Sequence, residues 1–596
     1  REAAAGGGDG LDQLLGPGFL AGDGRPDSPL SEEAAELSSA AADFPELPAR
    51  EVALGELLSA AGVAGRAAGV GPPPPARPRR APPLAAPPPN ADDAPMQTEH
   101  VDVLVVGAGL SGIAAGYHLQ ARCPDRTYAI LEQRDAIGGT WDLFRYPGIR
   151  SDSDMFTLGY SFKPWKEKKA IADGPSILRY VRETAAEFGI DQHIRFRTKV
   201  ESASWSSETA TWTVETTDAV TGEPRRYTCG FLFMCAGYYR YEAGYTPELA
   251  GRDDFRGEVV HPQRWDESVE HAGKRVIVIG SGATAVTLVP ELAKDAAHVT
   301  MLQRTPTYIV SVPAVDPIAE RIRQLLPERL GHQVTRWKNV FYGMALYHYC
   351  RRFPEHARRW IMGQIREELP GVDVDTHFNP PYAPWDQRLC LVPDGDLFEA
   401  IRAGRADVVT DHIERFTEKG LRLASGRELE ADLIVTATGL QVQFLGGLEL
   451  EVDGEPVVPS ELMNYKGAMF SDVPNLAIAL GYTNASWTLK ADLACMYVAR
   501  LLSYMHEHGH RIVTPRVTDP SVEVEPLIDL TSGYFQRVAH LLPKQGSKTP
   551  WKLYQNYLLD LLGMRFGKLV DDALEFDRPA RPRRTSVARP ASIAAE

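Results

Sequence analysis

The chain has 596 residues and a mass of 65.6 kDa, a length that allows two to four domains with sizeable cores. Hydrophobic residues make up 44% and charged residues 24%, as in ordinary globular proteins, and the net charge of −15 argues against a nucleic-acid surface. No apolar run is long enough for a membrane-spanning helix, and no signal peptide is visible. The six cysteines lack metal-ligand spacing, so we expect buried thiols in a reducing cytoplasm and no metal site.

The first 95 residues differ in composition from the rest of the chain. They contain no Lys, Tyr, Trp or Met, and Ala, Gly and Pro dominate them. Such a segment cannot bury enough apolar surface to offset the entropy lost on ordering. We therefore expect residues 1–95 to be a disordered extension, with a flexible interaction arm or a proline-rich docking segment as the alternative.

A glycine-rich turn follows the first strongly apolar segment. Residues 101–106 predict a buried parallel strand, and Gly107, Gly109 and Gly112 open an apolar-periodic segment that predicts a helix. At this spacing the glycines permit a tight turn, let the backbone approach a diphosphate and let helix and strand pack closely. Glu132, 20 residues after Gly112, ends the next expected strand and is placed to bind a ribose.

Residues 96–245 are predicted to hold this first dinucleotide-binding unit. After a loop with Gly138-Gly-Thr-Trp141 we expect a helix near Ser176–Phe188 and strands near Ile194–Val200, Ala203–Ser206, Thr211–Glu215 and Phe231–Gly237. The last of these strands runs into Ala236-Gly237, and small residues at a strand end let a backbone lie close to a flavin.

The same pattern of strand, glycine-rich turn and helix recurs later in the chain. Residues 274–279 predict a strand, and Gly280, Gly282 and Ala285 predict a second glycine-rich turn into a helix. The next expected strand, residues 298–304, ends not in an acid but in Arg304, which can pair with a 2′-phosphate. This predicts a preference for NADPH over NADH in a unit that spans residues 246–395.

Residues 315–370 are helical by pattern and rich in Arg, Trp and Tyr, so we expect a helical insertion within this second unit. Its charges are expected to form a solvated face, although a basic amphipathic contact with a membrane stays open. Residues 396–576, with a second small-residue strand end at Ala437-Thr-Gly439, are expected to complete the first unit. Residues 577–596 are expected to be a disordered tail.

Two dinucleotide-binding folds in one chain, the first with an acid and the second with an arginine, predict an FAD enzyme that is reduced by NADPH. The fold class is therefore α/β, with two Rossmann-like domains, a helical insertion and a disordered extension. A disulfide reductase is excluded, because no pair of cysteines has redox spacing.

A longer motif lies between the two folds. Phe255, Gly257, His261 and Trp265 stand in the pattern Phe-x-Gly-x-x-x-His-x-x-x-Trp-Asp. This pattern resembles the fingerprint of type I Baeyer–Villiger monooxygenases, which are class B flavoprotein monooxygenases. We expect His261 to orient the connection between the domains rather than to do chemistry.

The resemblance extends from Met96 to about Asp571 and is closest to the ethionamide-activating group of that family. Residues 138–154, 279–289, 385–393 and 481–490 carry it. It implies FAD, NADPH and insertion of one oxygen atom from O2 next to a ketone carbonyl, giving esters or lactones, with sulfur oxidation as a side activity.

Carried over position by position, the resemblance assigns cofactor contacts along the chain. With the glycines of the first turn and of the second small-residue strand end, the residues assigned to FAD are Gly107, Gly109, Ser111, Gly112, Glu132, Thr140, Trp141, Asp152, Val200 and Gly439. The residues that it assigns to NADPH are Arg150, Ser151, Asp152, Gly280, Ser281, Gly282, Ala283, Thr284, Ala285, Gln303 and Arg304.

The resemblance also implies the catalytic pair. Arg388 matches the arginine that faces the flavin and stabilises its anionic oxygen adduct, and Asp152 is expected to orient it. Many members of the family have Lys-Arg where this chain has Gln387-Arg388, so Arg304 carries more of the phosphate recognition and the NADPH preference is expected to be softer.

Two other functions remain open on the sequence alone. One is an S- or N-oxidising flavin monooxygenase without ketone activity, and the other is an FAD-binding redox sensor or interaction protein. For a monooxygenase the expected partners are a small-molecule ketone or sulfide substrate and O2, with oligomerisation left open.

Overall fold

A buried strand and the helix after it open the described part of the chain. The structure is a computed structural model that describes residues 98–528 and 530–577, all within one compact unit, Asn90–Glu596. The expected disordered extension, residues 1–95, and the tail beyond Asp577 lie outside the described residues. Strand β1 (Thr98–Val106) leads through the first glycine-rich turn into α4 (Leu110–Arg122), and β2 (Tyr128–Leu131) follows, as predicted.

The first sheet, here called the large sheet, is built around β1. In the described residues its strands run in the order β18-β17-β4-β5-β6-β1-β2-β3, with β19 to β21 joined through β6. β1 pairs in parallel with both β2 and β6, and β4, β5 and β6 form an antiparallel meander. The bounds are β3 Ile194–Arg195, β4 Thr198–Ser206, β5 Thr211–Asp218, β6 Pro224–Met234, β17 Glu449–Val452, β18 Glu455–Pro456, β19 Asn464–Tyr465, β20 Met469–Phe470 and β21 Leu476–Ile478.

The expected strands near 194–200 and 203–206 differ from the observed ones. Arg197 has a φ of 56°, which ends β3 after two residues, so the chain begins a new strand at Thr198. A bulge between Val200 and Ser202 then lets β4 continue without interruption to Ser206.

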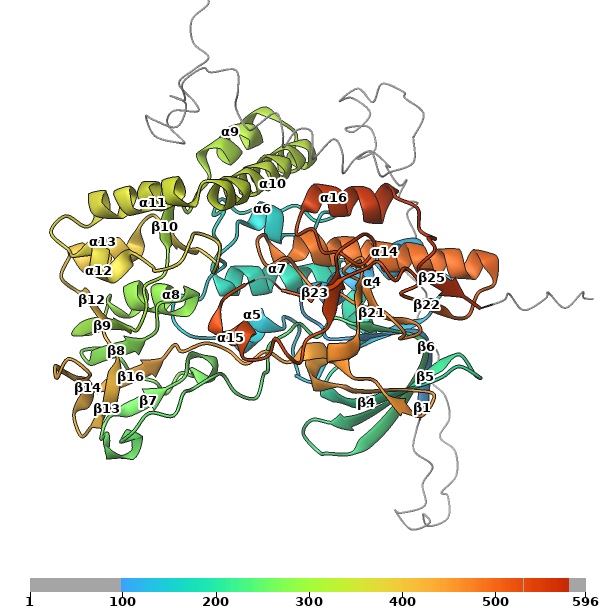
Figure 1. Cartoon of the computed structure of the whole chain (residues 1–596), viewed down its shortest axis with the longest axis horizontal. Helices are drawn as coiled ribbons and strands as arrows, with labels where there is room; N and C mark the ends of the chain where they lie inside the picture. Colours follow the sequence, from blue (N-terminus) through green and yellow to red (C-terminus); the bar gives the residue numbers. More distant parts are fainter. Residues whose placement is uncertain (1–97, 529, 578–596) are drawn as a thin grey trace, which may run out of the picture. The chain divides into compact units, whose positions relative to one another are not determined.

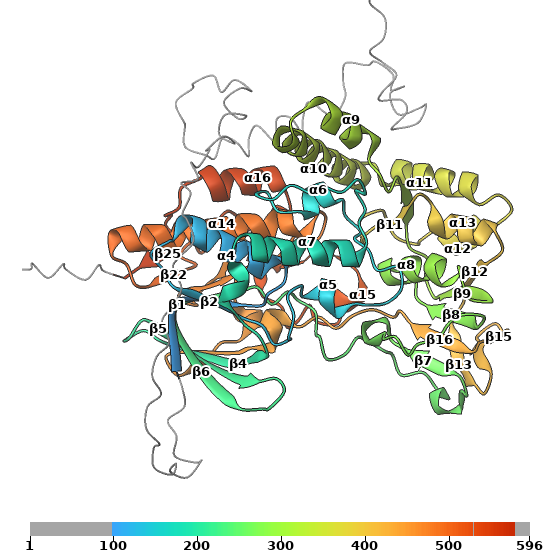
Figure 2. The same cartoon turned by 180° about the vertical axis from the view of Figure 1, so that it is seen from behind.

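The second sheet, here called the small sheet, is parallel throughout. In the described residues its order is β12-β9-β8-β16-β7, with the antiparallel ribbon β13-β14-β15 beside it. In both views of the cartoon, α5 and α15 lie between the two sheets (Figures 1 and 2). The bounds are β7 Glu258–Val260, β8 Arg275–Ile279, β9 His298–Gln303, β12 Ala406–Thr410, β13 Ile413–Thr417, β14 Gly420–Leu423, β15 Glu428–Glu430 and β16 Leu433–Thr436, and the helix after β8 is α8, Ala283–Leu292.

The expected domain boundary at residue 395 does not coincide with the boundary between the sheets. β12 pairs with β9 and β16 pairs with β8, so these two strands belong by hydrogen bonding to the small sheet rather than to the large one, and β13–β15 between them form a ribbon of their own. β16 carries four fully buried residues and reads like any buried strand, and nothing in such a run says which sheet it joins.

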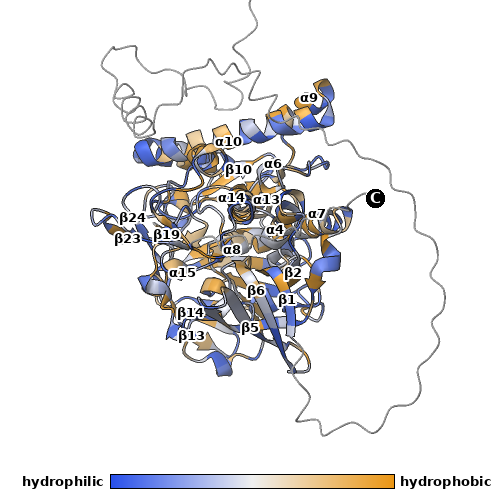
Figure 3. Cartoon of the chain, turned by 90° about the vertical axis from the view of Figure 1, so that its right-hand side faces the viewer, coloured by the Kyte–Doolittle hydropathy of each residue, from blue (hydrophilic) through white to orange (hydrophobic). Residues whose placement is uncertain are grey.

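The helical insertion is present where the sequence predicted it. It comprises α9 (Pro317–Leu325), α10 (Glu328–Arg352) and α11 (Pro354–Glu368), and Figure 3 shows both hydrophilic and hydrophobic residues along α9 and α10. The expectation of a solvated charged face is wrong for Arg336, which is 3% exposed. Its guanidinium donates to the carbonyl oxygens of Phe156 and Gly159, each at 2.8 Å, and so ties α10 to α6 (Met155–Leu158).

The chain returns to the large sheet after the small one is complete. β21 pairs in parallel with β6, and α14 (Trp487–His508) packs against α4. The remaining elements are α5 Thr140–Leu143, α7 Gly174–Glu187, α12 Val374–Phe378, α13 Asp396–Arg402, α15 Gly533–Gln536, α16 Tyr557–Leu561, β10 Ile309–Val312, β11 Cys390–Pro393, β22 Val513–Pro515, β23 Val524–Pro526, β24 Lys544–Gly546 and β25 Leu574–Phe576.

The state of the cysteines agrees with the sequence expectation. All six cysteines are buried and unpaired, as predicted. Within residues 98–528 and 530–577, no helix combines the length and the apolar character that crossing a membrane requires.

Candidate functional site

A cavity of about 1040 Å³ joins the two sheets at the carboxyl ends of their central strands. This is where parallel α/β sheets bind ligands, because helix N-termini and strand ends meet there. Most of the residues predicted from the sequence line it: Gly107, Gly109, Ser111, Glu132, Thr140, Trp141, Arg150, Ser151, Asp152, Val200, Gly280, Ser281, Gly282, Ala283, Thr284, Gln303, Arg304, Arg388 and Gly439. Gly112, Ala285 and the four fingerprint residues do not line it.

The two glycine-rich turns are built alike. Gly107 has a φ of 104° and Gly280 a φ of 138°, and a Cβ at either position would lie within 2.6 Å of a carbonyl oxygen, that of Cys235 or Ala437. Each turn is thus pressed against the backbone that leaves the neighbouring strand. A Cβ on Gly112 would come 1.8 Å from the Gly107 carbonyl oxygen, which explains a glycine that packs beneath the turn without lining the cavity.

The helices after these turns present unused backbone donors to the cavity. Gly109 caps α4 and Gly282 caps α8, and neither provides a side-chain hydrogen bond to the first turn. The first N–H groups of a helix then remain available, and together with the helix dipole they bind phosphate oxygens. Beside the strand ends, a Cβ on Gly237 or Gly439 would meet no atom within 4 Å, so both positions border open space.

Glu132 lies at the end of β2 and is 4% exposed. Its Oε2 accepts from the Ala108 N–H at 2.8 Å and its Oε1 from the Arg134 N–H at 3.0 Å. Burial raises the pKa of this carboxyl, and the two backbone donors oppose that shift. The carboxylate is therefore held rigidly against the first glycine-rich turn.

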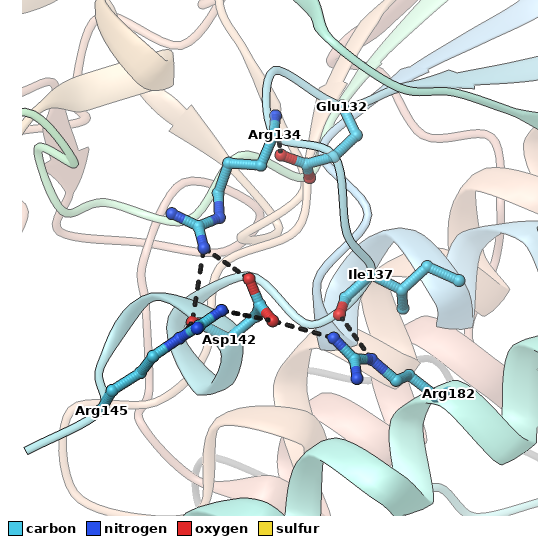
Figure 4. A network of polar contacts seen from close by, with 6 residues as sticks. All are labelled: Glu132, Arg134, Ile137, Asp142, Arg145 and Arg182. Atoms are coloured by element: carbon cyan, nitrogen blue, oxygen red, sulfur yellow. Dashed lines mark hydrogen bonds and ion pairs between the residues drawn. The ribbon is translucent and has the colours of Figure 1, made fainter. Parts of the chain in front are cut away.

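The loop after Glu132 is fixed by a buried carboxylate that the sequence did not reveal. Asp142 is 3% exposed, and its Oδ2 and Oδ1 accept from Arg134 and Arg182, the second at 2.8 Å. Arg145 donates to the Asp142 carbonyl oxygen at 3.2 Å, so three guanidinium groups converge on one residue (Figure 4). This cluster shapes the Gly138-Gly-Thr-Trp141 segment that lines the cavity.

Arg388 and Asp152 meet at the cavity wall. The Arg388 Nε lies 3.0 Å from Asp152 Oδ2, and its Nη2 lies 3.3 Å from Asp152 Oδ1. Burial disfavours charge on this guanidinium, but Asp152 and Tyr238 outweigh it, so the pKa of Arg388 stays above its ordinary value. The pair therefore presents a permanently positive group to the cavity, oriented by a carboxylate.

Aromatic side chains surround this pair. The Tyr238 ring stacks on Trp487 with 5.1 Å between centroids, and the Tyr238 hydroxyl lies 2.8 Å from that of Tyr239. Tyr534 also lines the cavity. Sequence reasoning missed Tyr534, which lies far from any motif. Tyr238 directly follows the small-residue end of β6, and that position was the available signal.

Arg304 and Gln303 are placed differently from one another. Arg304 lines the cavity and is exposed. The Gln303 amide instead donates to the His377 carbonyl oxygen at 2.6 Å and to Thr410 Oγ1 at 2.9 Å. That amide nitrogen is committed to α12 and β12. Of the two residues of the predicted clamp, Arg304 is the one with a side chain available to a ligand.

Two further predicted residues use their side chains within the protein. Arg150 forms an ion pair with Asp396 at the start of α13, and Ser151 Oγ donates to the Ser153 carbonyl oxygen at 2.7 Å. Arg537, which no motif marked, also lines the cavity, and its guanidinium lies over the Tyr245 ring at 3.6 Å.

His261 lies outside the cavity and holds the two connecting segments together. Its Nε2 lies 3.2 Å from the Gly439 carbonyl oxygen and its Nδ1 accepts from the Gln263 N–H at 3.2 Å. Burial lowers the pKa of this imidazole, so it is neutral with the proton on Nε2. A Cβ on Gly244 would come 1.9 Å from the ring, so the segment from the large sheet passes directly against it.

The other fingerprint residues pack around the same connection. Phe255 and Trp265 are each 8% exposed, and a Cβ on Gly257 would come 2.4 Å from the Phe255 ring. The motif therefore describes how the segment between the sheets is packed, and it brings no side chain to the cavity.

Comparison with known sequences points to one family. A family model described as flavin-binding monooxygenase-like matches residues 101–341. FAD-containing monooxygenase EthA of Mycolicibacterium smegmatis is 54% identical over 483 residues, covering 81% of this chain and 98% of the relative. EthA of Mycobacterium tuberculosis is 55% identical over 486 residues, covering 81% and 99%, and the putative FAD-containing monooxygenase MymA of the same species is 50% identical over 489 residues, also covering 81% and 99%.

Solved structures share the fold. An oxidized steroid monooxygenase bound to NADP matches with a TM-score of 0.63 at 24% identity, covering 80% of this chain and 99% of that one. The closed structure of cyclohexanone monooxygenase matches with a TM-score of 0.63 at 22% identity, covering 81% and 100%.

Proposed function

The chain belongs to the flavin-binding monooxygenase-like family and is thus an enzyme of the flavin-containing monooxygenase type, and from this membership we propose that it is a Baeyer–Villiger monooxygenase. In this proposal it uses FAD and NADPH to insert one oxygen atom from O2 next to a ketone carbonyl, giving an ester or a lactone. Oxidation of thioethers or thioamides at sulfur is the accompanying activity.

The residues at the first turn fit FAD. The uncapped N-terminus of α4 offers N–H groups to a diphosphate, and Glu132 closes the strand beside it, where a ribose would lie. Asp142 and its arginines hold the loop that would cover the cofactor. Open space beside Gly237 leaves room for a ring system at the end of β6.

The residues at the second turn fit NADPH. The N-terminus of α8 is likewise uncapped, and Arg304 follows the end of β9, where a 2′-phosphate would need a cation. Because the Gln303 amide is already hydrogen-bonded within the protein, Arg304 carries that recognition largely alone. This supports the softer preference for NADPH that we expected.

The single observation that carries the proposed chemistry is the Arg388–Asp152 pair in the cavity that joins both turns. When bound, the reduced flavin supplies one activated oxygen atom derived from O2. Arg388 offers a fixed positive charge where negative charge develops on oxygen, and such a preorganised donor acts most strongly where water is excluded. Asp152 fixes the plane of the guanidinium so that it need not reorganise.

Replacing Arg388 tests this proposal. We expect Arg388→Ala to be reduced by NADPH, as followed by the loss of flavin absorbance, but to form ester about 10²–10³-fold more slowly than the wild type. The matched control is Arg304→Ala, for which we expect a higher KM for NADPH at saturating ketone with ester formation retained.

Product analysis separates the alternatives. A panel of ketones and thioethers, analysed by mass spectrometry, should give a gain of one oxygen and ester fragments from the wild type. Sulfoxides without esters would favour an S-oxidising flavin monooxygenase. Bound FAD without NADPH-dependent oxygen uptake would favour a redox sensor, and undiminished ester output from Arg388→Ala would contradict the role of that residue.

A further inference from the structure

A second cavity, of about 80 Å³, adjoins the main one. Tyr238, Arg388, Trp487 and Tyr534 line both cavities, so the second one borders the main cavity at the proposed catalytic arginine. The rest of its wall is predominantly apolar. Ligand cavities of this kind fix orientation through a small number of polar groups set in an apolar wall.

One side of this second cavity carries a buried ion pair whose bonds are complete. Lys490 Nζ lies 3.0 Å from Asp560 Oδ2, and the Tyr482 hydroxyl donates to the same carboxylate at 2.5 Å. Lys490 also donates to the Lys466 carbonyl oxygen at 3.2 Å. These groups satisfy one another, so they stabilise the wall and leave no strong donor for a ligand.

Asn464 is different. It is 3% exposed, lines the same cavity, and its Nδ2 has no hydrogen-bond partner among the described residues. A buried amide N–H without a partner is costly, and native proteins rarely keep one unless water or a ligand completes it. Strand β19, which pairs with β20 through Phe470, fixes the backbone of this residue and so limits where the amide can move.

From this we infer that Asn464 is a specificity-determining residue, which donates a hydrogen bond to a second oxygen atom of the substrate, remote from the reacting group. The preferred substrate class is then an uncharged ketone or thioether that carries an ether, ester or hydroxyl oxygen on its apolar chain. The inference rests on the proposed function, because it places the reacting group at Arg388 and the chain in the second cavity.

A matched pair of substrates tests the inference. Two methyl ketones of equal chain length, one with a methylene and one with an ether oxygen at the remote position, differ only in the predicted acceptor. For the wild type we expect kcat/KM to favour the ether ketone about tenfold, as one neutral hydrogen bond in a buried site allows. In Asn464→Leu we expect that ratio to fall to about one.

Two further variants guard against loss of folding and against a pure size effect. Asn464→Asp keeps the shape and has no donor when its carboxyl group is ionised, so it should also abolish the preference at a pH at which that group is a carboxylate. Leu542→Ala enlarges the same cavity without touching a polar group, and should change both kcat/KM values while the tenfold ratio remains. Thermal melting of each variant confirms that it is folded.

Binding of both ketones is measured in parallel by calorimetry with the FAD-loaded protein. A wild-type enzyme that oxygenates both ketones without preference, or an Asn464→Leu variant that keeps the preference, overturns the inference and leaves the proposed function standing. Tighter binding of the ether ketone by the wild type but not by Asn464→Leu, with neither ketone oxygenated, supports the inference and overturns the proposed ketone chemistry.

Discussion

At the scale of the residue, Asp142 organises the loop that lines the cavity beside the first glycine-rich turn. The buried carboxylate of Asp142 accepts hydrogen bonds from Arg134 and Arg182, and the backbone carbonyl oxygen of the same residue accepts one from Arg145 (Figure 4). These bonds give a glycine-rich loop a fixed shape. Glycine-rich segments lose more conformational entropy on ordering than others, and a central anchor offsets that cost.

Replacing this anchor should loosen the loop. We expect Asp142→Asn to destabilise the protein by about 2 kcal/mol, since hydrogen bonds to charged groups contribute about 1.5–3 kcal/mol each. The same variant should retain less FAD after purification. The ratio of flavin to protein absorbance and the midpoint of urea unfolding measure both effects. Asp135→Asn, an exposed carboxylate in the same loop, is the control, and an equal loss of FAD in both variants would contradict the assignment.

Positions that local geometry determines could be predicted from the sequence, whereas positions that distant partners determine could not. Gly107, Gly280 and Glu132 were predictable because a turn and a strand end demand them at a fixed spacing. Asp142 and Asn464 could not be predicted, because what marks them depends on residues distant in the sequence. Asp142 is bound by distant arginines, and no described residue accepts a hydrogen bond from Asn464 Nδ2. The hydrogen bonds of Gln303 could not be predicted either, because its amide nitrogen donates to residues of α12 and β12 that lie far away in the sequence.

At the scale of the element, α10 is attached to α6 through buried polar groups. Arg336 satisfies carbonyl oxygens at the end of α6, and His332, one turn earlier, is 3% exposed with no hydrogen-bond partner for either ring nitrogen among the described residues. Burial and the nearby Arg336 lower the pKa of His332 to about 4, while Glu328 opposes that shift.

This histidine should make the stability of the protein depend on pH. Above pH 6.5 His332 is neutral in both the folded and the unfolded chain, and its full contribution to stability is present. Between pH 6.5 and about 4 only the unfolded chain binds the proton, so the free energy of unfolding falls, by about 3 kcal/mol in total.

Urea unfolding at several pH values measures this loss. We expect His332→Leu to lose less stability than the wild type between pH 6.5 and 4. His348→Leu, which removes an exposed histidine of the same helix, should behave as the wild type does. A pH dependence in His332→Leu as steep as that of the wild type would show that other groups cause it.

Helix existence was predictable at this scale, but helix docking was not. The pattern of residues 315–370 predicted α9, α10 and α11, yet their charges suggested a solvated face throughout. Arg336 and His332 are polar residues that face the protein, and periodicity cannot distinguish such positions from exposed ones.

At the scale of the whole described unit, the two sheets are joined through a histidine and a glycine that touch. Gly244 has no room for a Cβ because the His261 ring would lie 1.9 Å away, and that ring is hydrogen-bonded to Gly439 on the returning segment. The geometry of the join therefore depends on a pair of residues rather than on either alone.

A double-mutant cycle tests this dependence. We expect Gly244→Ala to destabilise the protein by about 2 kcal/mol, because the added methyl displaces the ring from a packed position. In a His261→Ala background the same methyl should cost little, which gives a coupling free energy of about 1–2 kcal/mol. Equilibrium unfolding of the four proteins provides the values, and additive costs would show that the contact does not limit the join.

Which strand joins which sheet was the part of the fold that the sequence left undetermined. The two turns predicted two dinucleotide-binding units, but nothing in the sequences of β12 and β16 indicates their partners. Both strands were expected in the first unit, and they pair with strands of the small sheet. Pairing is decided by which edge offers hydrogen bonds once the helices are in place, and that is a property of the assembled fold.

The return of the chain to the large sheet also has a consequence for biosynthesis. Every strand of the small sheet lies between Glu258 and Thr436, whereas the large sheet needs β21, and α4 needs α14, which ends at His508. During translation, all strands of the small sheet leave the ribosome before α14, the helix that packs against the apolar face of α4, has been synthesised. The half of the protein that is translated first therefore closes last, and a chain released early exposes a nucleotide cradle that cannot yet hold its ligand.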